Sequence, residues 1–118
     1  MDASEQLIIV ASAISEGINY LAYIRSLHAK SHVTSSEELL EWCKALDGLQ
    51  SGLKTFKDGN IGGHVLVGSP PVSSELILCI DNIRAHLSTI TPGTRLPTSL
   101  FDLIDAAWAE VMKLMQSS

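Results

Sequence analysis

The chain has 118 residues, which is enough for one domain with a hydrophobic core and too few for two, so residues 1–118 are expected to form a single domain. Charged residues make up 18% of the chain and apolar residues 46%, whereas roughly 25% of an ordinary globular protein is charged, so its surface is expected to suit burial in an assembly. The net charge is −5 and the basic residues are scattered along the chain, which excludes the basic patch that direct DNA or RNA binding requires.

The N-terminal residues do not have the pattern of a targeting sequence. The first six residues carry two acids and no base, whereas a signal peptide begins with a basic segment. We also expect no apolar stretch to reach the roughly 18 residues that a membrane span needs. The sequence therefore predicts a cytoplasmic protein with no membrane contact.

The first predicted helix, Ser4 to about Ser31, is apolar around most of its circumference. At 100° per residue, apolar side chains fill an arc of roughly 220°, whereas about 100° suffices for one core face. The polar sector contains Glu5, Ser12, Ser15, Glu16, Asn19 and Ser26, and the apolar arc contains Leu7, Ile9, Val10, Ala11, Ala13, Ile14, Ile18, Tyr20, Leu21, Ala22, Ile24 and Leu27. Such a helix must be covered on two sides, either within its own domain or by a partner.

The second predicted helix begins at Ser35, which has the spacing of a capping box with Glu38. Its apolar residues recur at alternating steps of three and four as far as Phe56, which indicates one packing face. Gly48 and Gly52 each cost about 1 kcal/mol in a helix interior relative to alanine. These glycines either permit close helix approach or mark a point where the helix frays.

Two more helices follow. The third is predicted from Ser73 to Thr89 and ends before Pro92, and the fourth begins at Pro97 and ends near Met115. Three amphipathic helices packed around the broadly apolar first helix satisfy its need for burial. The predicted fold is therefore all-α, a compact four-helix domain with one long loop containing glycine and proline between the second and third helices.

That loop, residues 58–72, is long for a connection within a helical bundle. Its centre contains Ile61 and the run Val65, Leu66 and Val67, which are too apolar for a fully solvated loop. Residues 65–67 are predicted to form a short extended segment that packs on the bundle or pairs with another chain. The loop either attaches to the core of its own domain or contacts a partner or a ligand.

His28 and His32 lie four residues apart near the end of the first predicted helix. Both imidazoles could therefore face one metal ion, with Glu37 or Glu38 as an oxygen ligand. However, no glutamate follows His28 as the metalloprotease helix requires, and the glycines of the loop match no nucleotide-binding fingerprint.

The remaining polar residues assemble no catalytic set. Cys43 and Cys79 lie within apolar helical patterns, where a free thiol acts as a small hydrophobic side chain. No enzyme activity, cofactor or metal is predicted.

We therefore predict a non-enzymatic interaction module that forms a homodimer through its first and fourth helices and masks another protein. A small acidic helical protein without a DNA-binding surface can regulate transcription by occluding a regulator, as an antiactivator does. Large aromatic, flexible or apolar side chains are expected at the interface. The predicted partner-binding residues are Ile9, Tyr20, Tyr23, Ile24, Leu27, Val65, Leu66, Val67, Trp108 and Met112.

The alternative is a helical protein that binds a metal ion or a small ligand at one site formed by His28, His32 and the loop 58–72. A site inside a bundle normally places several polar groups along the inward faces of the helices. The inward faces predicted here are almost purely apolar, which favours the interaction module. The width of the apolar arc does not distinguish an interior first helix from an interfacial one.

Overall fold

A computed structural model describes residues 3–61, 63–65 and 72–116. The helices are α1 (Ala3–Ser26), α2 (Ser36–Asp58), α3 (Ser74–Leu87) and α4 (Thr98–Gln116), and a short 3-10 helix, η1 (Leu27–Ala29), directly follows α1. Two short strands, β1 (Asn60–Ile61) and β2 (His64–Val65), lie between α2 and α3. The predicted all-α, four-helix domain is confirmed.

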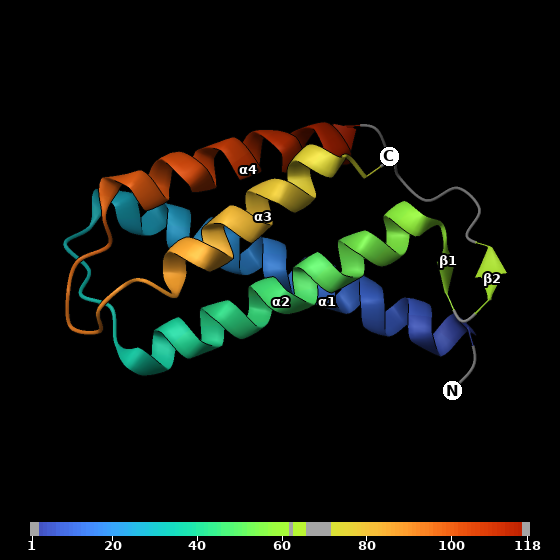
Figure 1. Cartoon of the computed structure of the whole chain (residues 1–118), viewed down its shortest axis with the longest axis horizontal. Coiled ribbons are helices and arrows are strands. Elements are labelled where there is room, and N and C mark those ends of the chain that lie inside the picture. The colour runs from blue at the N-terminus through green and yellow to red at the C-terminus, as the bar shows by residue number, and fades with distance from the viewer. Residues whose placement is uncertain (1–2, 62, 66–71, 117–118) are drawn as a thin grey trace.

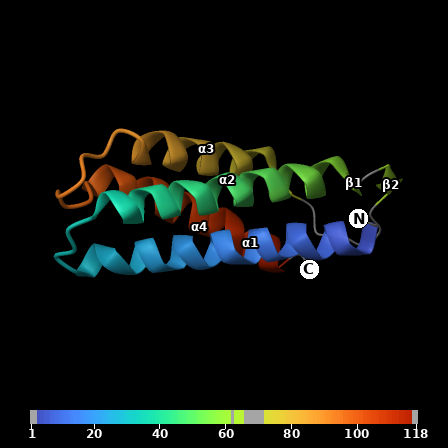
Figure 2. The ribbon, with the colours of Figure 1, turned by 90° about the horizontal axis from the view of Figure 1, so that it is seen from below.

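The helices run alternately in opposite directions along a body of 45 × 28 × 19 Å (Figure 1). The principal contacts are those of α1 with α2 and of α3 with α4, and α1 and α3 lie on opposite faces of the bundle (Figure 2). Figure 1 shows α1 and α4 close together where α4 begins and well apart where α1 begins. The first turns of α1 therefore receive no cover from α4.

Local sequence signals set the helix ends. The backbone N–H of Glu38 donates to Ser35 Oγ over 3.1 Å, and the backbone N–H of Ser35 donates to Glu38 Oε1 over 3.0 Å, so the predicted capping box is present. Ser73 caps α3 by accepting from the backbone N–H of Leu76. The end of α2 is fixed by Gly59, whose φ of 73° is readily adopted only by glycine.

The α-helical part of α1 is shorter than predicted, since it ends at Ser26 rather than near Ser31. The chain tightens there into η1, a 3-10 turn of the kind that often terminates an α-helix. The hydroxyl of Ser26 also donates to the carbonyl of Tyr23 and thereby satisfies one acceptor of the last turn. The change of direction brings residues 27–32 beside the start of α4.

The core lies where the four helices meet. Its largest fully buried side chains are all apolar, apart from the indole nitrogen of Trp42, and they come from all four α-helices. They are Leu21, Ile24, Trp42, Leu46, Leu49, Leu53, Leu76, Ile80, Ile83, Leu87, Leu100 and Ile104. The apolar positions of α2 that recur at steps of three and four therefore face inward as predicted, with Phe56 half-buried at the end of the series.

The predicted extended segment at Val65 pairs within its own chain. Strands β1 and β2 are antiparallel, with Asn60 opposite Val65 and Ile61 opposite His64. Ile61 is buried and anchors this hairpin, whereas the side chain of Val65 is exposed. Leu66 and Val67 lie outside the described residues.

The contact between α1 and α2 depends on two glycines. A Cβ atom at Gly17 would overlap the side chain of Leu49, and one at Gly52 would lie 2.7 Å from Ile14 Cγ1. At Gly48 a Cβ atom would meet only Ala13 Cβ, at an ordinary 3.8 Å. Because α2 continues through Gly52 to Asp58, this glycine permits close helix approach rather than marking a frayed end.

Alanine substitutions at Gly17 and Gly52 should have the opposite effect to the same substitution at Gly48. Gly17→Ala and Gly52→Ala are each expected to lower the free energy of unfolding by about 1–3 kcal/mol, because the added methyl group overpacks the α1–α2 contact. Gly48→Ala, the matched control, should raise it by up to about 1 kcal/mol through helix propensity alone. Urea denaturation of the three variants measures these values. Equal stabilisation by all three substitutions would contradict the close-approach explanation.

Candidate interaction surface and the opposite pocket

The first turns of α1 expose three consecutive large apolar side chains. Leu7, Ile8 and Ile9 are 38%, 65% and 53% exposed. Successive residues of an α-helix point about 100° apart, so these three face widely different directions. The helix is therefore uncovered around much of its circumference at this level.

The hairpin adds a fourth apolar side chain at the same end of the bundle. Val65 is 78% exposed, and both views place the hairpin at the end where α1 begins (Figures 1 and 2). We call Leu7, Ile8, Ile9 and Val65 the apolar end. Since exposed apolar side chains gathered in one region mark interaction sites more often than scattered ones do, this end is the candidate interaction surface.

The expectation that no apolar stretch reaches the length of a membrane span is wrong. The segment Ser4–Ala29 is long and apolar enough by composition, with a mean hydropathy of 1.6 over its best 18-residue window. Only 22% of that window is buried inside the fold. The polar residues of α1 are mostly uncharged Ser and Asn, which interrupt the apolar pattern without lowering its mean hydropathy below the range of a span.

Two residues predicted to bind a partner lie in the core of the chain. Ile24 and Leu27 are buried, together with Leu21. These three follow one another at steps of three, so they share one side of the helical path and turn toward the other helices. Ile24 and Leu27 therefore contribute no surface to an interface.

Three other predicted partner-binding residues are engaged with their own chain. The hydroxyl of Tyr20 donates to Glu41 Oε1 over 2.7 Å, and this hydrogen bond raises the pKa of Tyr20 above its ordinary value of 10.0. Tyr23 packs edge-on against Trp42 with ring centroids 6.3 Å apart. Trp108 is half-buried, and the guanidinium of Arg25 lies 5.6 Å from its ring centroid.

Met112 is also half-buried, against the core. Of the predicted partner-binding residues that the structure describes, Ile9 and Val65 are the most exposed. The apolar arc predicted from the sequence omits Ile8, although it is more exposed than Ile9. The run of four apolar residues from Leu7 to Val10 is the signal that identifies it, because one core cannot cover every side of a helix turn.

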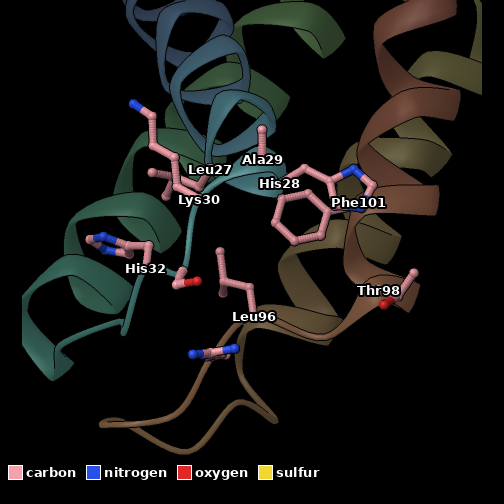
Figure 3. A pocket seen from close by; sticks show the side chains of 10 residues that line it. Leu27, His28, Ala29, Lys30, His32, Leu96, Thr98 and Phe101 are labelled. Atoms are coloured by element: carbon pink, nitrogen blue, oxygen red, sulfur yellow. The ribbon is translucent and has the colours of Figure 1, made fainter.

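The opposite end of the bundle contains a cavity of about 280 Å³ between the α1–α2 connection and the start of α4. Its lining residues are Leu27, His28, Ala29, Lys30, Ser31, His32, Arg95, Leu96, Thr98 and Phe101. Figure 3 shows His32 on one side and His28 with Phe101 on the other. We call this cavity the end pocket.

The two histidines of the end pocket have separate partners. The ring of His28 stacks on Phe101 at a centroid distance of 4.4 Å. His32 Nε2 lies 2.9 Å from Glu38 Oε2, and its ring is tilted against Trp42. Within the described ranges, no three His, Cys, Asp or Glu side chains are grouped to hold a metal ion.

The structure does not bring His28 and His32 together with the described residues of the loop 58–72. The histidines lie where α1 ends, whereas the hairpin of the loop lies where α1 begins (Figure 1). These two ends are separated by the length of α1, which spans about 36 Å at 1.5 Å per residue over its 24 residues. A ligand at the histidines would therefore not touch the hairpin.

Glu38 belongs to the N-terminal cap of α2 and also contacts His32, which lines the end pocket. The backbone N–H of Ser35 lowers the pKa of Glu38 below its ordinary value of 4.5, and His32 adds to this effect through its hydrogen bond and charge. A carboxyl group whose pKa is lower in the folded chain stabilises the fold above its unfolded pKa. That contribution is lost as the pH falls through the folded pKa.

Glu38→Gln should therefore flatten the acid limb of the stability profile. At pH 7 the substitution is expected to lower the free energy of unfolding by about 0.5–1 kcal/mol, because a neutral amide replaces the charged acceptor of the cap. The difference from the unsubstituted chain should shrink below about pH 4.5 and vanish once the carboxyl is protonated. Glu37→Gln, in the same helix turn, controls for the helix dipole. Urea titrations between pH 3 and 7 test this, and parallel profiles for both variants would contradict it.

Comparison of the chain with protein-family models, with characterised proteins and with solved structures finds no match. Its function is therefore inferred from its own surfaces.

Proposed function

We propose that this chain is a non-enzymatic interaction module that binds a protein partner through its apolar end. The observation that carries the proposal is the exposure of Leu7, Ile8 and Ile9 in the first turns of α1. Transfer of a large aliphatic side chain from water into an interface contributes about 1.5–3 kcal/mol. A few such side chains are enough to supply the energetic centre of an interface.

The hairpin supports the same proposal. Ile61 is buried beneath it while Val65 faces outward, so the loop is anchored to the fold and still presents an apolar side chain. An anchored loop loses less conformational entropy on binding than a free one. The apolar end thus combines a rigid helix with a positioned hairpin.

The partner we propose is a regulatory protein that the module masks, such as a transcription regulator held inactive. The net charge of −5 and the scattered basic residues favour a protein partner over direct nucleic-acid binding. We also propose that two copies pair through α1 and α4, since a two-fold interface places the same apolar side chains of both copies against each other. A cytoplasmic location is part of this proposal.

The test compares two surface variants of the full chain. Ile8→Ser/Ile9→Ser removes apolar side chains from the proposed interface, and Leu40→Ser removes a 73% exposed leucine from the N-terminal half of α2, near the opposite end. Neither variant touches the buried core, so both should melt within a few degrees of the unsubstituted chain. Native mass spectrometry and pull-down from the host of the protein give the subunit number and the partner.

The double variant is expected to weaken partner binding and self-association at least tenfold, while Leu40→Ser leaves both unchanged. Unchanged binding in the double variant would refute the proposal. Binding of the unsubstituted chain to neutral phosphatidylcholine vesicles, abolished by the same double substitution, would instead identify the apolar end as a membrane contact. That outcome would replace a protein partner with a lipid surface.

A further inference from the structure

We propose that the end pocket binds a small organic anion, one that carries a carboxylate or phosphate group on a compact apolar body. The basic side chains around the cavity are the first observation. His28, Lys30, His32 and Arg95 are among its lining residues, and none of the lining residues is Asp or Glu. In a chain with 13 acidic and eight basic residues, this is a local reversal of the overall charge.

Of the basic side chains at the pocket, His32 is paired with Glu38, whereas Lys30 and Arg95 have no carboxylate partner within the described part of the chain. Arg25, Arg84 and Lys113 form ion pairs with nearby carboxylates. Lys30 and Arg95, by contrast, form no ion pair with any described residue. Arg95 therefore offers an anion in the pocket a guanidinium with no competing carboxylate partner. Figure 3 shows the ammonium end of Lys30 extending away from the other lining side chains, so Lys30 adds positive charge at the rim.

The segment that carries Arg95 is held in place by the backbone. Val33 and Arg95 form an isolated antiparallel bridge. Beside it, the N–H of Thr34 donates to the carbonyl of Thr94 over 3.1 Å, and the N–H of Gly93 donates to the carbonyl of Thr34 over 2.8 Å. Arg95 and the chain that follows His32 thus keep a fixed relation, which reduces the ordering cost of binding.

The start of α4 adds to the attraction for an anion. Thr98, the first residue of α4, lines the pocket, and the first turn of this helix contains no acidic residue. The free N–H groups of a helix N-terminus carry partial positive charge. They reinforce the charge of Arg95 but do not define the site by themselves.

Apolar side chains complete the cavity and indicate the body of the ligand. Leu27 and Phe101 are nearly fully buried, Leu96 is half-buried, and all three line the pocket. Figure 3 shows Leu96 and Phe101 beside one another on the α4 side. A volume near 280 Å³ lies at the lower limit of ligand sites, so the ligand is a small molecule with one charged group.

The first experiment is an NMR titration of the full ¹⁵N-labelled chain with phenyl phosphate, with benzoate and with benzyl alcohol as the neutral control. Either anion is expected to shift the amide signals of residues 27–32, 95, 96 and 98–101 with a roughly millimolar dissociation constant. Whichever binds more tightly identifies the charged group, and benzyl alcohol should produce no shift. Absence of shifts with both anions at about 10 mM, or equal shifts with the alcohol, would overturn the proposal.

The second experiment compares Arg95→Gln with Lys54→Gln. Arg95 lines the pocket, whereas Lys54 is exposed in the C-terminal half of α2 and also forms no ion pair with a described residue. Arg95→Gln should raise the dissociation constant about tenfold, and Lys54→Gln should leave it unchanged. Thermal melting checks that both variants fold. An equal effect of the two substitutions would show that only net charge matters and would refute a site at the pocket.

This inference is independent of the proposed protein interaction. Ile8→Ser/Ile9→Ser changes the opposite end of the bundle and should leave anion binding unaffected. A loss of anion binding in that variant would contradict the assignment of the ligand to the end pocket.

Discussion

Two glycines, Gly17 of α1 and Gly52 of α2, let these helices approach more closely than a side chain with a Cβ atom would permit. The path of α1 therefore follows α2 over most of its length. Since α4 diverges from this path, it does not cover the N-terminal turns of α1 (Figure 1). The contact that organises the bundle is thus also the reason that Leu7, Ile8 and Ile9 are left uncovered, as burial against α2 reaches only one side of the helix.

The same arrangement gives the two ends of the bundle different chemistry. At one end the first turns of α1 and the last turns of α2 extend past α3 and α4 together with the short hairpin, and apolar side chains meet solvent (Figures 1 and 2). At the other end two connections and a helix start meet, and Lys30 and Arg95 come to line one cavity. Binding at one end needs no movement at the other, because the rigid, apolar interior of the bundle separates them.

The elements of the fold could be predicted because each depends on local sequence. The spacing of Ser35 and Glu38 predicted the start of α2, and the recurrence of apolar residues every three or four positions predicted its buried face. The exposed surface was less predictable, because the broad apolar arc of α1 does not determine which neighbouring helix covers which side. Ile9 and Ile24 both belong to that arc, yet one is exposed and the other buried. The end pocket was beyond prediction from pattern alone, since Arg95 reaches it only through its tertiary bridge to Val33.

Four described titratable groups have pKa values shifted by burial or by hydrogen bonds. Burial raises the pKa of both thiols, Cys43 and Cys79, above the ordinary value of 9.0, which keeps them protonated and weakly nucleophilic at neutral pH. The hydrogen bond to Glu41 similarly keeps the phenol of Tyr20 protonated. Glu38 is shifted the other way, toward its charged form, but its partners are a helix cap and His32. In each case the shift favours the protonation state that the group already has near pH 7, because burial disfavours the charged thiolate and a hydrogen bond stabilises the protonated phenol or the charged carboxylate.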